Sequence, residues 1–300
     1  MKNTFLILHS AVAMMPPLLL AACGGLFTEI SGMLNIALEG LLLAGSFSAV
    51  VAVYYTGSIT AGLIFAIIIS IALSAIFGFT VLKLHSNVFI AGLAVNLFSS
   101  GLSVMLSQYF FNTRGVVNLS VSLAGNRQLN DIRIPLIKDI PVLGQLFSGH
   151  NLYVYSSWIL LVISWIVIYK TPFGYRMRAC GKHSTALISL GINPDAYRWT
   201  AFLISGFFCG IGGSFLSLSL AAFIPNMTAG KGWIALVIIF LGGRRPIGLF
   251  AAALAYCLAS SLSNYAQGVL TLPADLILAM PYLLTLLAMI AVSVFTKHKS

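Results

Sequence analysis

The chain has 300 residues, of which 59% are hydrophobic and 7% are charged, and its formal net charge is +10. Soluble domains carry about 25% charged residues, and their surfaces must face water, so this composition excludes a soluble globular protein. A lipid bilayer instead solvates an apolar exterior. The basic residues stand singly between apolar stretches, which is typical of membrane-protein loops and argues against nucleic-acid binding.

Apolar stretches of about 20 residues predict transmembrane helices. In chain order they cover 5–26, 33–54, 61–84, 88–108, 152–169, 199–222, 232–243, 247–266 and 275–295. The stretch 232–243 is short, so it predicts either a half-helix or a helix that begins nearer Phe223. The sequence therefore predicts an all-α polytopic membrane protein, a single transmembrane domain over 1–300 with about nine transmembrane helices.

The beginning of the chain offers one alternative. Lys2 and the apolar run that ends at Cys23 resemble a lipoprotein signal, which normally precedes a polar mature domain. The residues after Cys23 are more apolar still, so we expect a transmembrane helix here instead. The other cysteines, Cys180, Cys209 and Cys257, form no CxxC pair and are interpreted, like Cys23, as small packing residues.

Basic residues near the ends of spans predict the orientation, because Lys and Arg are enriched in cytoplasmic loops. With segment 170–198 in the cytoplasm, alternation of nine spans puts ten of the 16 Lys and Arg residues on the cytoplasmic side and six outside. This predicts an outside N-terminus, a cytoplasmic C-terminus and an extracytoplasmic loop over 109–151.

Glu39 lies about two turns inside the second predicted span, where an ionisable residue costs at least ~2.5 kcal/mol by insertion scales. Asn35 precedes it by four residues, so in a continuous helix its amide could donate a hydrogen bond to the carboxylate. Two interpretations remain open. The residues line or brace a translocation path, or they form a structural polar pair that locks helices together.

Segment 170–198 predicts a short helix between basic flanks. Ser184 is suited to cap its start, Gly191 suits a left-handed residue after its end, and Pro194 would prevent its continuation. Such a helix along the membrane surface would be a docking element for a cytoplasmic partner; an inert amphipathic loop is the alternative.

Catalytic motifs are missing from the sequence. GxxxxGK[ST], HExxH and GxSxG do not occur, and Gly230-Lys231-Gly232 lacks the earlier glycine and the hydroxyl residue of a phosphate-binding loop. We therefore expect no enzyme activity, no cofactor and no metal site. Energy from ATP would have to enter through another chain.

Several motifs follow one another in a fixed order along nearly the whole chain. They are PPLLLAA at 16–22, GGLFTE at 24–29, SGMLNIALEGLLLAG at 31–45, IPVLG at 140–144, FGYRMRACG at 173–181, AGKGWIAL at 229–236, LGG at 241–243 and PIG at 246–248. These motifs resemble the permease subunits of ATP-binding-cassette importers for simple sugars, nucleosides and branched-chain amino acids, and most of all the shorter permease of bacterial nucleoside importers. The chain departs from the usual pattern at Arg244-Arg245, where the family often has a small or hydrophobic pair.

The resemblance implies a location in the bacterial inner (cytoplasmic) membrane and import by alternating access. A substrate-binding lipoprotein would deliver purine nucleosides from outside to two permeases, a heterodimer more readily than a homodimer. Two ATPase subunits would grip the short helix and its flank, formed by Ser184, Thr185, Ala186, Leu187, Ile188, Ser189, Leu190 and Gly191.

Other functions remain as alternatives. Within the same family, the solute would be a simple sugar such as ribose or galactose, or a branched-chain amino acid. A secondary transporter would need a coupling-ion site or inverted repeats, and a lone Glu39 without evident repeats argues against it. A membrane enzyme would need a catalytic constellation, which the sequence lacks.

Overall fold

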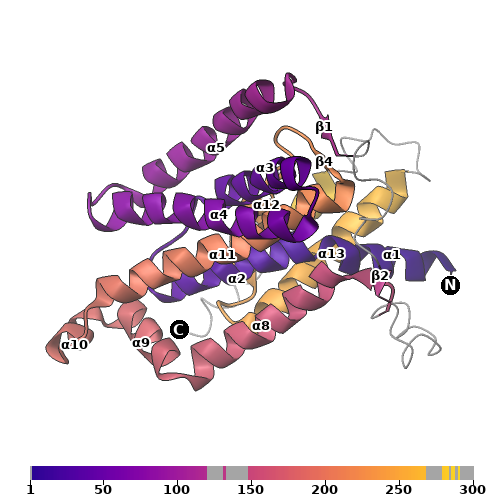
Figure 1. Ribbon diagram of the computed structural model, residues 1–300. Coiled ribbons are helices and arrows are strands. Elements are labelled where there is room, and N and C mark those ends of the chain that lie inside the picture. Colours follow the sequence, from indigo (N-terminus) through magenta and orange to yellow (C-terminus); the bar gives the residue numbers. More distant parts are fainter. Residues whose placement is uncertain are drawn as a thin grey trace.

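The computed structural model of the protein describes residues 2–119, 131–132, 148–267, 279–283, 285–287 and 290. These residues fold mainly into helices. In chain order the helices are α1 (Lys2–Met14), α2 (Pro16–Ile30), α3 (Leu38–Thr56), α4 (Ile59–Leu82), α5 (Val88–Phe111), α8 (Leu152–Lys170), α9 (Pro172–Lys182), α10 (Ser184–Ser189), α11 (Pro194–Leu220), α12 (Lys231–Leu241) and α13 (Pro246–Gln267) (Figure 1).

Two antiparallel pairs of very short strands lie toward the N-terminal end of the bundle (Figure 1). Strand β1 (Val117–Asn118) pairs with β4 (Ala222–Phe223), and β2 (Asp131–Ile132) pairs with β3 (His150–Asn151). The first pair connects the segment after α5 to the segment after α11, which are remote in the sequence.

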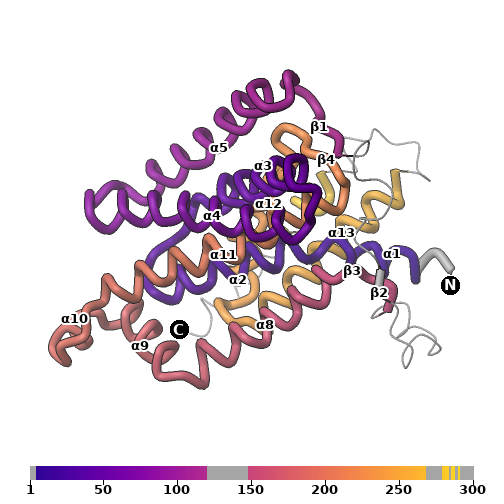
Figure 2. Tube along the Cα trace, viewed as in Figure 1, coloured from indigo at the N-terminus to yellow at the C-terminus, as the bar shows by residue number. Residues whose placement is uncertain are grey.

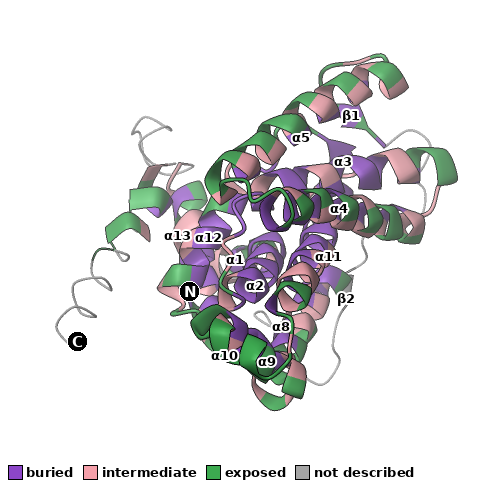
Figure 3. Ribbon diagram, turned by 90° about the vertical axis from the view of Figure 1, so that its left-hand side faces the viewer, coloured by how far each residue is buried: buried purple, intermediate pink, exposed green. Residues whose placement is uncertain are grey.

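The centre of the bundle is formed by α2 and α11. Every residue of α2 from Pro16 to Thr28 is buried, as expected for a helix that is apolar on all sides. Helix α11 packs against α2, α3 and α4. Figure 3 shows buried residues concentrated in α2, α3 and α11, with exposed ones on α5, α9 and α10.

The number of candidate spans is smaller than the nine expected. In the described part of the chain, α3, α4, α5, α8, α11 and α13 are long and apolar enough to cross a membrane, and α1 with α2 makes a seventh if the pair is one bent span. The expected span 275–295 lies largely outside the described residues. An all-α polytopic membrane protein is thus confirmed, with six or seven candidate spans.

The first predicted span, 5–26, is a bent pair of helices, α1 and α2. The chain bends by 44° between α1 and α2. Pro16 occupies the first position of α2, where its missing N–H is no loss, whereas within a continuous helix its ring would clash with the preceding turn.

The second span also begins later than expected, at Leu38 and not at residue 33. After α2 the chain turns through Gly32, whose φ is +85°, a left-handed conformation that glycine adopts without steric cost. Asn35 consequently lies before α3 and not inside it, so the helical spacing assumed for Asn35 and Glu39 does not exist.

The short stretch 232–243 is a half-helix. Helix α12 has 11 residues, Lys231–Leu241, and at 1.5 Å per residue it is about 16 Å long, roughly half the hydrocarbon core of a bilayer. It does not extend back to Phe223, because Ala222 and Phe223 form β4.

Small residues allow α11 to approach its neighbours closely. A Cβ atom on Gly206 or Gly210 would lie 2.7 Å from the Cα of Ile71 or 2.6 Å from the Cα of Ile67, both on α4. The Gly206–Gly210 spacing therefore has the packing role that small residues four apart have between membrane helices.

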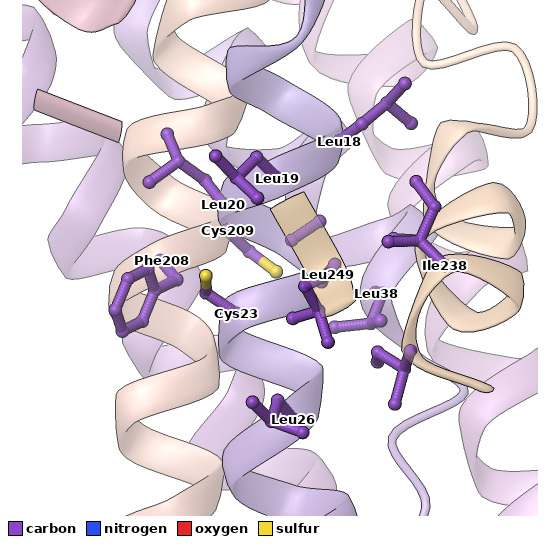
Figure 4. Packing of buried hydrophobic residues seen from close by; sticks show 14 of the residues in the cluster. Leu18, Leu19, Leu20, Cys23, Leu26, Leu38, Phe208, Cys209, Ile238 and Leu249 are labelled. Atoms are coloured by element: carbon purple, nitrogen blue, oxygen red, sulfur yellow. The ribbon is translucent and has the colours of Figure 1, made fainter. Parts of the chain in front are cut away.

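The cysteines are also packing residues in the core. All four are buried and unbridged. Figure 4 shows the side chains of Cys23 on α2 and Cys209 on α11 directed into the space between these helices, among Leu19, Leu20 and Phe208.

Candidate functional site

Asn35 connects the turn before α3 to the central helix α11. Its side-chain nitrogen donates to the Ser205 hydroxyl at 2.8 Å, and its oxygen accepts from the Ala37 N–H at 3.0 Å. Asn35 is fully buried. The predicted hydrogen bond from Asn35 to Glu39 was therefore wrong, because the amide is used by other partners outside the helix.

Glu39 instead holds the start of the half-helix α12. One carboxylate oxygen accepts from the Gly230 N–H at 2.8 Å, and the other accepts from the Gly232 N–H at 2.6 Å. The first N–H groups of a helix have no partner inside the helix, and a negative charge is favourable there. The carboxylate thus satisfies two of these donors with charge-assisted bonds.

The second glycine is also required by close packing. A Cβ atom on Gly232 would collide with the backbone of Leu38 and Glu39. The motif Gly230-Lys231-Gly232, which sequence reasoning treated only as a failed phosphate-binding loop, is the backbone that receives Glu39. Two glycines flanking the first residue of a short apolar helix were the signal that could have indicated this contact.

Asn96 on α5 completes the attachment of α3, and sequence reasoning missed it. Its oxygen accepts from the Gly40 N–H at 2.8 Å, and its nitrogen donates to the Ile36 carbonyl at 2.9 Å. An asparagine inside an apolar span was the available signal, since a buried amide needs partners. Asn35, Glu39 and Asn96 together fix the start of α3 against α11, α12 and α5.

The predicted short helix is present as α10, at the end of the bundle remote from the N-terminus (Figure 2). The residue before it is His183, without a side-chain cap, so the prediction that Ser184 caps the helix was wrong. Gly191 does adopt the left-handed conformation, with φ of +74°. The Ile192 N–H bonds to the Leu187 carbonyl and the Gly191 N–H to that of Ile188, which is a Schellman ending.

The two faces of α10 differ. Leu187 is buried, whereas Ile188 is 61% exposed and Leu190 beside it is 74% exposed. Pro194 does more than prevent continuation of α10, because it begins α11 after the capping side chain of Asn193. The described part of α10 therefore presents apolar side chains outward on a short, well-ended helix.

Helix α9 is attached to the start of α11, and α10 connects them. Arg176 donates to the Tyr197 hydroxyl at 3.2 Å, and the Cys180 thiol contacts the Pro194 carbonyl at 3.5 Å. Burial raises the pKa of the Cys180 thiol, and nearby Arg198 opposes that shift. This thiol therefore remains protonated and serves packing.

Within the described residues, no group of three His, Cys, Asp or Glu side chains is placed to hold a metal ion. The polar contacts join helix ends to each other, as they do in a protein whose helices must hold a defined arrangement inside a membrane.

The chain matches known proteins along nearly its whole length. The family described as the permease component of the branched-chain amino acid transport system matches residues 7–293. The chain belongs to this family. It is therefore a multi-pass membrane permease subunit of a bacterial ATP-binding-cassette importer, and not itself the ATPase. An importer of this kind works with an ATPase and a solute-binding protein.

Individual relatives carry more specific names. The nucleoside permease NupC of Lactococcus lactis subsp. cremoris is 31% identical, over 91% of this chain and 87% of its own length. The guanosine permease NupQ of Bacillus subtilis is 32% identical, again over 91% and 87%. A permease named for glucose, TsgC13 of Haloferax volcanii, is 28% identical over 87% of this chain and 78% of its own.

Proposed function

We propose that this permease translocates nucleosides, in particular purine nucleosides, delivered by a substrate-binding lipoprotein. The observation that carries the proposal is the similarity at 31% and 32% identity to two permeases named for nucleoside and guanosine transport. The permease named for glucose, at 28% identity, supports simple sugars as the second candidate solute, ahead of branched-chain amino acids.

The proposed contact with the ATPase is α10 with its flank, Ser184–Gly191. Its support is the exposure of Ile188 and Leu190 on a helix whose two neighbours are attached to each other. An apolar projection of this kind fits a cleft on a partner protein and transmits displacement to α9 and α11. Without a partner, two large apolar side chains would remain in water.

The proposed orientation has α10 in the cytoplasm and the N-terminus outside. The basic residues Lys182, Arg244 and Arg245 all lie around one pocket at the α10 end of the bundle, which supports that end as the positive, cytoplasmic side. A second permease, different from this chain, would complete the translocation unit.

Asn35 and Glu39 are proposed to brace the translocation unit and not to bind the solute. Each side chain makes two hydrogen bonds to protein groups: Asn35 to the Ser205 hydroxyl and the Ala37 backbone, and Glu39 to the backbone of Gly230 and Gly232. A carboxylate already occupied by two backbone donors is poorly placed to recognise a sugar hydroxyl.

The test uses the complete complex, with ATPase, both permeases and binding protein, in sealed vesicles. Uptake of radiolabelled guanosine driven by ATP is expected to exceed uptake of ribose, galactose and leucine by at least about tenfold. A complex without ATPase activity, made by substitution in the ATPase subunit, is the control for leakage. Preferential uptake of a sugar or of leucine would reject the nucleoside proposal and leave the family assignment intact.

A further inference from the structure

A pocket of about 1080 Å³ lies at the α10 end of the bundle, away from the Glu39 contacts. Its walls come from the end of α2, from α8 and α9, and from the turn between α12 and α13. Four cationic side chains line it, those of Arg178, Lys182, Arg244 and Arg245, against the single carboxylate of Glu29. We refer to this site as the basic pocket.

The one carboxylate neutralises only one of the four cations. Glu29 forms an ion pair with Arg244, whose Nε lies 2.9 Å from the carboxylate oxygen. Among residues 2–119 and 148–267, Arg178, Lys182 and Arg245 form no ion pair. Like charges gathered in a concave site repel one another and raise the local concentration of anions.

The guanidinium of Arg178 lies between two aromatic rings in the wall of the pocket. Its guanidinium carbon lies 4.8 Å from the ring centres of both Tyr169 and Tyr175, so aromatic rings contact the group. Its Nε is buried and has no hydrogen-bond partner within the described residues. A guanidinium presents its N–H groups in its own plane, in a fork that matches the oxygens of a phosphate.

The backbone around the pocket favours the same ligand. The first turn of α13 lines it, and this helix has 22 residues. The N–H groups at a helix start attract negative charge. This feature supports the site only together with the cationic side chains and the unpartnered Nε of Arg178.

We propose that the basic pocket binds a phosphate group, through Arg178 and Arg245 with Lys182 contributing charge. The phosphate comes either from the headgroup of an anionic lipid or from a soluble phosphorylated molecule. The site is distinct from the Ser184–Gly191 element, and its occupancy would connect α2, α9 and the α12–α13 turn, and so affect the stability of the bundle. The proposal does not require the transported solute to be a nucleoside.

The test measures binding to the purified complex in nanodiscs, which expose both faces of the protein. One arm titrates radiolabelled inorganic phosphate in phosphatidylcholine discs. The other compares thermal unfolding in phosphatidylglycerol and phosphatidylcholine discs and identifies retained lipids by native mass spectrometry. The variant is Arg178→Gln with Arg245→Gln. The control is Arg176→Gln, which removes one charge from the same helix as Arg178 at a residue that does not line the pocket.

We expect wild-type protein and the Arg176→Gln control to bind alike, and the double variant to bind at least about tenfold more weakly, because charge-assisted contacts are lost. Binding of free phosphate in phosphatidylcholine discs would assign the ligand as a soluble phosphate. Stabilisation by phosphatidylglycerol alone would assign it as a lipid headgroup.

Two results would overturn the proposal. The first is that neither arm distinguishes wild-type protein from the double variant, or that Arg176→Gln weakens binding equally. The second is that wild-type protein binds neither phosphate nor anionic lipid, and that the double variant no longer retains the ATPase subunit. That result would make the pocket a protein-docking surface. Circular dichroism of each variant checks that it is folded.

Discussion

Glu39 illustrates how a single ionisable residue inside a membrane protein is stabilised. The carboxylate is retained near the bilayer interior because two backbone N–H groups at the start of α12 need an acceptor. The charge is thus compensated by a helix end, with nearby Lys231 interacting with it electrostatically, and not by Asn35. Removing the carboxylate would leave both donors without a partner.

Substitution of Glu39 tests this contact. Glu39→Ala should destabilise the purified complex by about 1–3 kcal/mol for each unsatisfied donor. Glu39→Gln should also destabilise it, although less, because a side-chain amide offers one acceptor and turns a donor toward the other N–H. The measurement is thermal unfolding in detergent.

The matched carboxylate control is Asp195→Ala. Asp195 is half exposed and pairs with Arg198 on the surface, so its loss should change stability little. Wild-type stability of Glu39→Ala, with reduced solute uptake, would reject bracing in favour of a direct role in the pathway.

At the scale of elements, helices α11 and α10 differ in how closely they are packed. Helix α11 is packed so closely on α4 that its glycines cannot be enlarged without separating backbones. Helix α10 is packed loosely by comparison, because the side chains of Ile188 and of the adjacent Leu190 are mostly exposed. The first element serves stability, and the second serves the proposed coupling.

Gly210→Ala should destabilise the fold, because its Cβ would lie 2.6 Å from the Cα of Ile67, a backbone atom that cannot move alone. Overpacking of this kind costs about 1–3 kcal/mol. The control is Gly101→Ala on α5, where a Cβ meets nothing within 4 Å. Expression level and melting temperature in detergent are the measurements, and equal values for the two variants would contradict the packing role.

Ile188→Asp should weaken the ATPase's attachment or uncouple ATP hydrolysis from transport, while the permease remains folded, because Ile188 is 61% exposed. The comparison variant is Leu187→Asp, which buries a charge in the contact of α10 with its neighbours and should reduce stability as well. Co-purification with the ATPase and transport per ATP hydrolysed are measured. Full coupling in Ile188→Asp would remove α10 from the mechanism.

At the scale of the whole molecule, basic side chains gather at one end of the bundle. Glu29, Lys182, Arg244 and Arg245 meet at the α10 end, whereas the N-terminus and both strand pairs lie at the other (Figure 1). This asymmetry is what the positive-inside rule requires of an oriented membrane protein. It supports the orientation predicted from the loops.

Cysteine labelling tests that orientation. In a background without the four native cysteines, His183→Cys should be protected from an impermeant maleimide added to intact cells, and Val116→Cys should be labelled. Both side chains are exposed in the protein, so access depends on the membrane alone. Permeabilised cells, in which both positions should react, provide the control. Labelling of position 183 from outside would reverse the orientation.

The sequence alone determined the class of protein. Apolar stretches predicted the spans, because a helix can cross the bilayer when about 20 consecutive residues are apolar, and this is a property of the local sequence. Ordered motifs predicted the family, and Gly191 predicted the end of α10, because left-handed backbone is itself a local requirement. The nine-span count was not reproduced in the described residues, and the first span is bent before Pro16.

The partners of Asn35 and Glu39 were decided only by the tertiary structure. Helical spacing predicts which residues share a face, but α3 begins at Leu38, so that spacing did not apply. Glu39 bonds to residues 191 and 193 positions away, and the basic pocket joins Glu29 to Arg244 across an even longer separation. Contacts of this range depend on how α2, α3 and α12 pack together, and no local pattern encodes that packing.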